Sequence, residues 1–210
     1  MSYAVKEAFL TLQGEGIQAG SRAVFLRFAG CNLWSGREQD RATAQCNFCD
    51  TDFVGTDRPG GGKFASAAEL AAHIEVLWGQ GQERRLVVVT GGEPMLQLDT
   101  FLIDALHARH FRVAVESNGT LAATSGIDWL CISPKAGTDI VQRSGDELKL
   151  VWPQHGIEPA DLEGWDFRHF LVQPMDCADG QAAMDAAIAL AMERPQWRLT
   201  LQAHKVVGLK

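Results

Sequence analysis

Apolar residues in this chain fall either into short runs or into longer stretches with helical spacing. Leu86–Val89 is a continuous apolar run, which is typical of a strand buried on both faces of a parallel sheet. Other short runs bounded by polar or glycine-bearing segments predict strands at Val5–Leu10, Arg22–Phe28, Arg112–Glu116, Asp128–Ser133, Glu147–Val151, His169–Val172 and Trp197–Leu201. Helical spacing predicts a helix after Ser66, a second after Pro94 and an alanine-rich helix at Gln181–Met192, and residues 204–210 follow as a tail.

The first two predicted helices have recognisable ends and core faces. Ser66 is the expected N-cap, because Glu69 follows it in capping-box position, and Gly79 and Gly81 are expected to end the helix. The residues expected on its core face are Leu70, Ile74, Leu77 and Trp78. In the second helix they are Leu98, Phe101, Leu102, Ala105 and Leu106.

Polar or glycine-bearing segments follow one predicted strand after another. These segments are Thr90–Pro94, Glu116–Gly119, Ser133–Lys135 and Gln173–Asp176. Strands that alternate with helices favour a mostly parallel sheet of an α/β protein, and the carboxyl ends of its strands carry the functional site. A complete eight-unit barrel needs about 250 residues, so the 210 residues here predict one domain with a partial, open βα barrel. We expect residues 30–62 to form an enlarged loop and residues 202–210 to close over the site.

Composition narrows the function classes. Hydrophobic residues make up 46% and charged residues 21% of the chain, which is ordinary for a soluble globular protein. The net charge of −7 argues against a nucleic-acid partner, which needs a basic surface. The chain shows neither a signal-peptide pattern nor an apolar stretch of membrane-spanning length, so we expect a cytoplasmic protein without a membrane partner.

Three of the five cysteines are clustered, with the spacing C-x14-C-x2-C at Cys31, Cys46 and Cys49. This arrangement favours a metal site in a reducing compartment over a disulfide framework. Three thiolates are one short of a closed four-cysteine site, and an iron–sulfur cluster held by three leaves one iron free for another ligand. Structural zinc is the alternative, but it needs a fourth protein ligand, and the nearest downstream histidine, His73, falls in a predicted helix. Cys131 and Cys177 lie outside the triplet and are expected to be buried.

Two motifs resemble those of radical S-adenosylmethionine (SAM) enzymes. Cys46–Cys49 has the form C-x-aromatic-C that closes their cluster motif, and Gly91–Pro94 resembles their G-G-E-P motif, which meets the amino group of SAM. The first gap has fourteen residues instead of the commonest three, which is similar to the 7-carboxy-7-deazaguanine synthase subgroup. Further segments that resemble this subgroup are Thr11–Gly16, Phe25–Asn32, Cys49–Thr51, Glu116–Thr120, Ser133–Lys135, Gln173–Met175 and Gln202–Lys205.

The resemblance implies one 4Fe–4S cluster on the three cysteines, with SAM bound to its free iron. It implies no catalytic residue beyond the cluster and SAM. The residues that it implies for SAM binding are Asn47, Phe48, Cys49, Asp50, Gly92, Glu116, Asn118, Ser133, Pro134, Lys135, Gln173, Pro174, Met175 and Asp176. It also implies that Thr51 is a Mg²⁺ ligand, which suits a hard cation that keeps substrate oxygens and waters in its shell.

The substrate of the subgroup is 6-carboxy-5,6,7,8-tetrahydropterin. Its carboxylate needs a cation, and Arg27 can supply a bidentate fork. The residues expected to bind the substrate are Leu12, Gln13, Gly14, Glu15, Arg27, Thr90, His204 and Lys210. At Lys210 the terminal carboxylate would make the contact, although the subgroup ends in proline.

The resemblance further implies a homodimer and a flavodoxin-type electron donor. The route served would be 7-deazapurine (queuosine) biosynthesis, with loss of ammonia during a radical ring contraction. Two alternatives remain: a radical SAM activase that makes a glycyl radical on a partner protein, and a zinc-stabilised binding module. Gln13, Glu15 and Arg27 favour a small-molecule substrate over a protein partner.

Overall fold

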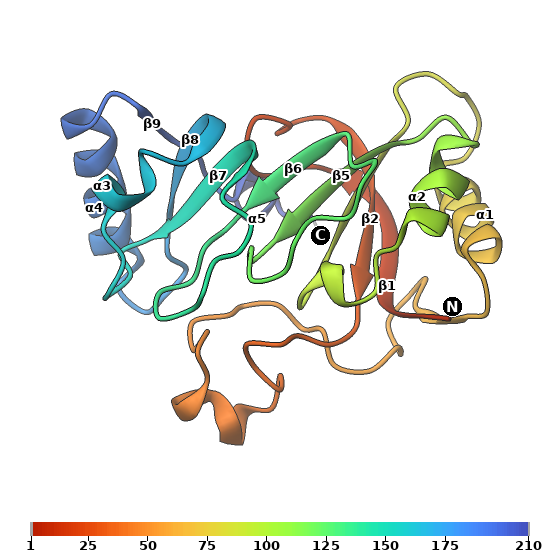
Figure 1. The fold of residues 1–210 in the computed structure, drawn as a ribbon, viewed down its shortest axis with the longest axis horizontal. Helices are drawn as coiled ribbons and strands as arrows, with labels where there is room; N and C mark the ends of the chain where they lie inside the picture. The colour runs from red at the N-terminus through yellow and green to blue at the C-terminus, as the bar shows by residue number, and fades with distance from the viewer. Residues whose placement is uncertain (1, 210) are drawn as a thin grey trace.

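A computed structural model describes residues 2–209 and shows one nine-stranded sheet, in the order β3-β1-β2-β4-β5-β6-β7-β8-β9 (Figure 1). The strands are β1 (Tyr3–Leu12), β2 (Arg22–Phe28), β3 (Gly62–Phe64), β4 (Leu86–Gly91), β5 (Arg112–Ser117), β6 (Trp129–Ile132), β7 (Ser144–Trp152), β8 (Asp166–Pro174) and β9 (Trp197–Leu199). Each neighbouring pair from β2 to β9 is parallel, whereas β1 runs antiparallel to β2 and β3. The prediction of a mostly parallel, open sheet is therefore confirmed.

Helices connect most of the parallel strands. They are α1 (Ala67–Trp78), α2 (Thr100–His107), α3 (Pro159–Leu162), α4 (Gly180–Glu193) and α5 (Ala203–Val207), with short 3-10 turns η1 (Glu38–Thr43) and η2 (Pro94–Leu96). In the described chain, no helix lies between β5 and β6 or between β6 and β7. Ala123 and Ile127, from the first of these connections, pack against the core in place of a helix.

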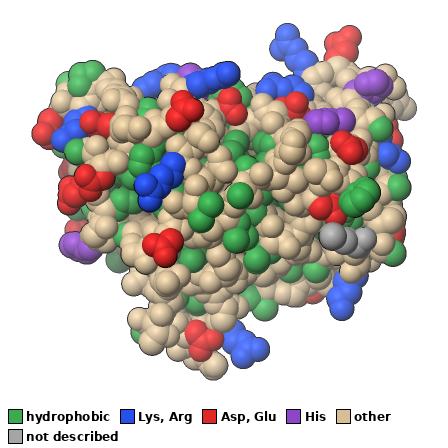
Figure 2. Space-filling view, viewed as in Figure 1, with side chains coloured by type: hydrophobic (Ala, Val, Ile, Leu, Met, Phe, Trp, Pro, Cys, Tyr) green, Lys and Arg blue, Asp and Glu red, His purple; other side chains and the backbone are tan. Residues whose placement is uncertain are grey.

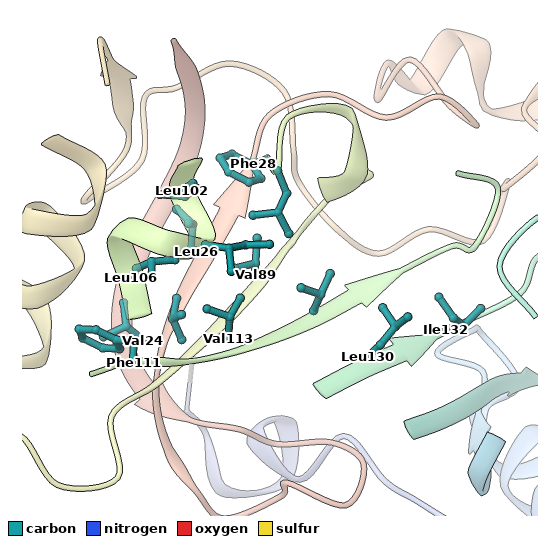
Figure 3. Close-up of a cluster of buried hydrophobic side chains, with 14 of the residues drawn as sticks. Val24, Leu26, Phe28, Val89, Leu102, Leu106, Phe111, Val113, Leu130 and Ile132 are labelled. Atoms are coloured by element: carbon teal, nitrogen blue, oxygen red, sulfur yellow. The ribbon is translucent and has the colours of Figure 1, made fainter. Parts of the chain in front are cut away.

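The core lies between the helices and one face of the sheet. In Figure 3, Val24, Leu26 and Phe28 alternate along β2 and face Leu102 and Leu106 of α2. The same alternation turns the intervening residues of β2, among them Arg27, toward the opposite face of the sheet.

Helix α1 forms as its local signals predict. The Ser66 hydroxyl accepts a hydrogen bond from the Glu69 amide at 3.2 Å, and the Glu69 carboxylate accepts one from the Ala65 amide at 2.7 Å. Gly79 ends the helix with φ at 81°, a conformation that favours glycine. The predicted capping box and helix end are therefore confirmed.

Three predictions of local structure were wrong. Phe101 is 68% exposed, because the buried face of α2 consists of Leu102, Ile103 and Leu106, and Phe101 lies beside that face. Cys177 is exposed, because it lies in the connection between β8 and α4, whereas Cys131 is buried in β6 as expected. Most of the predicted tail is helical, since α5 covers Ala203–Val207.

The charge on one face of the surface and the lengths of the helices are two further features of the fold. On the face shown in Figure 2, Lys and Arg side chains are interspersed with Asp and Glu side chains. Within residues 2–209, none of the helices has the length and apolar character needed to span a bilayer.

Candidate active site

A cleft of about 690 Å³ opens where the carboxyl ends of the parallel strands meet the 30–62 loop and the C-terminal segment. All three clustered cysteines line it. So do most of the other predicted site residues, namely Leu12, Gln13, Gly14, Glu15, Arg27, Phe48, Asp50, Thr51, Thr90, Gly92, Glu116, Asn118, Ser133, Lys135, Gln173, Pro174, Met175, Asp176 and His204. Asn47 and Pro134 do not line the cleft, and Lys210 lies outside the described residues. One cleft thus brings together residues from almost the whole length of the chain.

The cysteines form the wall of this cleft on the loop side. The Leu33 amide donates a hydrogen bond to Cys31 Sγ at 3.4 Å, and this contact orients the sulfur of Cys31. A hydrogen bond from the Cys46 thiol lowers the pKa of Cys49 to about 6, which favours the thiolate at Cys49. The same hydrogen bond raises the pKa of Cys46, and burial raises the pKa of Cys31. Among residues 2–209, no three His, Cys, Asp or Glu side chains converge tightly enough to hold a single metal ion. Three cysteines that line one cleft fit an iron–sulfur cluster, in which each cysteine ligates a different iron.

Glycine brings the end of β4 against the start of the cysteine loop. A Cβ on Gly92 would lie 2.2 Å from the Gly30 carbonyl oxygen and 2.6 Å from Cys31 Cβ, so only glycine fits at this position. The Glu93 amide also donates to the Gly30 carbonyl oxygen at 3.0 Å. The segment that resembles a SAM-binding motif therefore lies beside the first cysteine.

The buried Glu93 carboxylate connects this segment to the end of β5. It accepts hydrogen bonds from the Met95 amide at 2.9 Å, from Ser117 Oγ at 2.8 Å and from the Asn118 amide at 2.8 Å. Asn118 Nδ2 in turn donates to Asn32 Oδ1 at 3.0 Å, next to Cys31. Burial raises the pKa of Glu93, and the three hydrogen bonds partly oppose this shift. The same hydrogen bonds fix the position of the carboxylate.

A buried lysine forms the floor of the cleft, and the sequence analysis missed it. Lys149 Nζ donates to Glu116 Oε2 at 2.8 Å and to the Glu15 carboxylate, while Gln13 Nε2 donates to Glu116 Oε1 at 2.8 Å. Although burial opposes ionisation of Glu116, the Lys149 ammonium lowers the pKa of that carboxyl. The signal was present in the sequence, because Lys149 lies between Leu148 and Leu150 in a predicted strand. Glu116 is thereby placed next to Gln13 and Glu15.

Arg27 lies in the cleft with a carboxylate partner of its own. Its Nε donates to Glu7 Oε1 at 2.9 Å, across the antiparallel pairing of β2 with β1. Glu7 also lines the cleft and was not singled out from the sequence. This ion pair fixes the orientation of the guanidinium inside the cleft.

Two further polar side chains are suited to a ligand. Gln173 Oε1 is buried and has no hydrogen-bond partner among residues 2–209, although its residue lines the cleft. A buried acceptor without a partner carries a desolvation cost that a ligand N–H would remove. Lys135 Nζ donates to the Ser133 carbonyl oxygen at 2.6 Å and to Ser133 Oγ at 2.8 Å, and burial lowers its pKa. Together with the thiols, these groups fit a polar cofactor bound beside an iron–sulfur cluster.

The C-terminal segment lies across the mouth of the cleft. The Ala203 amide donates to the Gly14 carbonyl oxygen at 2.9 Å, and Gln202 Nε2 donates to Glu15 Oε1 at 3.0 Å. Lys205 Nζ contacts Asp50 Oδ2 at 2.8 Å and Asp176 Oδ2 at 2.5 Å, and so joins the cysteine loop to the end of β8. Helix α5 thus connects three of the segments that surround the cleft.

Thr51 lines the cleft two residues after Cys49, and its Oγ1 donates to Asp50 Oδ1 at 3.5 Å. A single hydroxyl of this kind suits a cation that keeps most of its shell for waters and substrate oxygens. Its role as a Mg²⁺ ligand stays a prediction.

Residues 39–148 match the family model of the radical SAM superfamily. Over 209 residues the chain is 60% identical to the 7-carboxy-7-deazaguanine synthase of Caulobacter vibrioides, and over 210 residues it is 57% identical to that of Bradyrhizobium diazoefficiens. Each alignment covers 100% of both chains. The fold is similar to the crystal structure of QueE from Escherichia coli, with a TM-score of 0.70, 27% identity and coverage of 97% of this chain and 95% of that one.

Proposed function

The chain belongs to the radical SAM superfamily and, within it, to the 7-carboxy-7-deazaguanine synthases, and we propose that it converts 6-carboxy-5,6,7,8-tetrahydropterin to 7-carboxy-7-deazaguanine with loss of ammonia. The observation that carries this proposal is that three groups of residues line one cleft. They are the three cysteines, the glycine segment at the end of β4, and the charged floor formed by Lys149, Glu15 and Glu116. The enzyme is a radical SAM lyase of 7-deazapurine biosynthesis.

When bound, a 4Fe–4S cluster and SAM would supply the radical chemistry that the substrate requires. Cys31, Cys46 and Cys49 would hold the cluster. Gly92 lets the end of β4 pack against Gly30 and Cys31, and its backbone would lie beside the methionine part of SAM. The unpaired Gln173 Oε1 would accept a hydrogen bond from SAM, and Ser133 and Lys135 would contact its polar groups. The protein would position SAM and the substrate and exclude water from the cleft, because a primary radical reacts with any nearby group.

The remaining predicted residues extend this proposal. We propose that SAM also contacts Asn47, Phe48, Asp50, Asn118, Pro134, Pro174, Met175 and Asp176, and that the substrate contacts Leu12, Gly14, Thr90, His204 and the terminal carboxylate of Lys210. Arg27, held by Glu7, would bind the substrate carboxylate together with Mg²⁺ on Thr51. Gln13 and Glu15 offer an amide and a carboxylate to the aminopyrimidinone edge. We place Glu116 on the substrate side, because it bonds to Gln13 and Lys149.

Assembly and electron supply are also proposals. The family resemblance favours a homodimer and a flavodoxin-type electron donor in the cytoplasm. We propose that the chain is one domain in which residues 30–62 and 202–210 cover the cleft from two sides. Asp50 of the first segment forms an ion pair with Lys205 of the second.

Anaerobic reconstitution tests the function. The protein is loaded with iron and sulfide, reduced, and given SAM, Mg²⁺ and 6-carboxytetrahydropterin. We expect 7-carboxy-7-deazaguanine with SAM largely unconsumed. A protein that cleaves SAM and leaves the pterin unchanged would contradict the proposed substrate and favour the activase alternative, and a colourless zinc protein would contradict the cluster.

Replacing Lys205 with methionine tests the C-terminal cover. The variant loses both ion pairs of α5, and because these side chains are partly exposed, each pair is worth about 0–1 kcal/mol. We expect the KM for the pterin to rise by roughly two- to fivefold at low salt, with a smaller change in kcat. Steady-state kinetics at low and high salt measure this effect, and wild-type protein at high salt should approach the variant. An unchanged KM at low salt would show that the cover does not depend on Lys205.

A further inference from the structure

The fourteen residues between Cys31 and Cys46 form a small folded unit. Trp34 is buried and packs edge-on against the buried Phe53 ring, with centroids 5.6 Å apart. The Trp34 Nε1 donates to the Arg37 carbonyl oxygen at 3.2 Å, and η1 follows directly. In Figure 1 this loop extends from the strand ends as a separate lobe. The first half of the loop therefore has a fixed place relative to Cys31.

Arg41 connects this fixed half to the other two cysteines. Its guanidinium carbon lies 4.2 Å from the centroid of the Trp34 ring, and its Nε donates to both carboxylate oxygens of Glu38, at 2.9 and 2.8 Å. Its Nη1 donates to the Asn47 carbonyl oxygen at 2.9 Å and to the Cys49 carbonyl oxygen at 3.0 Å. One side chain thus contacts the anchored tryptophan and the main chain on both sides of Phe48.

A long loop between two cysteines carries an entropic cost of closure, and the contacts of Arg41 offset it. Closing a flexible loop becomes less probable roughly as the power −3/2 of its length, so fourteen residues in place of three lower the chance of closure by about tenfold. With three residues between the cysteines, loop length alone keeps them together. With fourteen, the cysteines stay together only if other contacts fold the loop.

We propose that Arg41 is the positioning residue that preorganises Cys46 and Cys49 against Cys31 for the 4Fe–4S cluster. The stacked guanidinium uses charge-assisted hydrogen bonds to two carbonyls of the same turn, and so fixes the turn that carries both thiols. Lysine cannot replace it, because an ammonium group has no planar fork that stacks on Trp34 while it bonds in two directions. The proposal rests on the cluster implied by the family and not on the pterin chemistry.

Cluster assembly in Arg41→Met and Arg41→Lys tests the proposal. Apoprotein is reconstituted without oxygen, and the growth of visible absorbance, the iron and sulfide per chain and the electron paramagnetic resonance (EPR) spectrum of the reduced cluster are recorded. We expect both variants to assemble about tenfold more slowly than wild type and to lose iron faster to a chelator. The EPR signal of each reduced variant should be broadened, and a spectrum taken before reduction should include the signal of an oxidised three-iron cluster. In both apoproteins, Cys46 should react faster with an alkylating agent while the alkylation of buried Cys131 is unchanged.

Arg37→Met is the matched control, because Arg37 is an exposed arginine of the same loop. Its main chain accepts a hydrogen bond from Trp34 Nε1 and donates one to Ser35 Oγ, and both contacts survive the substitution. We expect it to assemble the cluster at the wild-type rate. The thermal midpoint of all three apoproteins should agree, since Arg41 lies outside the hydrophobic core.

Wild-type assembly and EPR spectra in Arg41→Met would overturn the proposal. Wild-type cluster assembly in Arg41→Lys would overturn it as well, because a positive charge alone would then be sufficient to position the cysteines. Failure of the proposed function has a different signature: wild type would hold its cluster and leave the pterin unconverted, while the variants would still differ from it in iron content.

Discussion

Replacing Cys49 with alanine is expected to abolish product formation and to leave the protein without a complete cluster. The side chain supplies one of only three thiols in the cleft, and its pKa is lowered to about 6 by the hydrogen bond from Cys46. Two thiolates cannot hold a cluster that needs three, and without the cluster no group in the chain can supply an electron to SAM. Product formation should fall to the level of a protein-free control. Iron and sulfide per chain, together with the brown colour after reconstitution, measure the cause directly.

Cys131→Ala is the matched control for this experiment. Cys131 is buried in β6 and does not line the cleft, so its replacement removes a sulfur from the chain without removing a cluster ligand. We expect this variant to keep its iron and its turnover, with only the small stability loss of a minor cavity. A Cys49→Ala variant with a full complement of iron would refute the assignment of the three ligands.

Local sequence signals predicted those elements whose determinants are near in sequence. Arg22–Phe28 and the helix that begins after Ser66 have the predicted bounds, because an alternating apolar strand and a capping box are set by a few neighbouring residues. The error at Phe101 concerned the face of a helix. Leu102 and Leu106 are buried as predicted, but Ile103 completes the buried face of α2, and Phe101 lies on its exposed side.

Contacts between distant elements could not be predicted in the same way. Lys149, Glu15 and Glu116 come from β7, from the segment after β1 and from β5, and their meeting depends on the order of strands in the sheet. Alternation indicates which face of its strand Lys149 occupies, but nothing in its neighbourhood specifies two carboxylate partners. The fold of the cysteine loop was missed for a related reason: it has no apolar periodicity, and its order comes from Trp34, Arg41 and Phe53.

Replacing Lys149 with methionine should have the second large effect, on stability and turnover together. The variant leaves the Glu15 and Glu116 carboxylates beside each other without their cation, and breaking a buried pair in this way costs about 3–5 kcal/mol. For a chain of this size, that corresponds to a fall of roughly 10 °C in the thermal midpoint. Both carboxylates would also move, and displacement of positioning groups by about 1 Å lowers kcat/KM by roughly a hundredfold. Thermal unfolding and steady-state kinetics measure the two effects.

The dependence of this effect on pH identifies its cause. In wild type, Lys149 holds the pKa of Glu116 below the ordinary value of 4.5, so the carboxylate stabilises the fold above that value and loses its contribution as the pH falls. Without Lys149, burial raises the pKa of the same group, and its charged form destabilises the fold at neutral pH. The difference in midpoint between the two proteins should therefore shrink from about pH 7.5 to about pH 5. A constant difference over this range would show that lost packing, and not the uncompensated carboxylates, destabilises the variant.

Arg85→Met separates loss of stability from loss of positioning. Arg85 is 5% exposed and pairs with Glu75 at 2.7 Å, but it does not line the cleft. We expect this variant to lose stability as well, and to keep the wild-type kcat/KM at a temperature where it is folded. If Lys149→Met also kept the wild-type kcat/KM, the charged floor of the cleft would serve the fold alone. A loss confined to Lys149→Met would show that the lysine holds Glu15 and Glu116 in the places that the substrate requires.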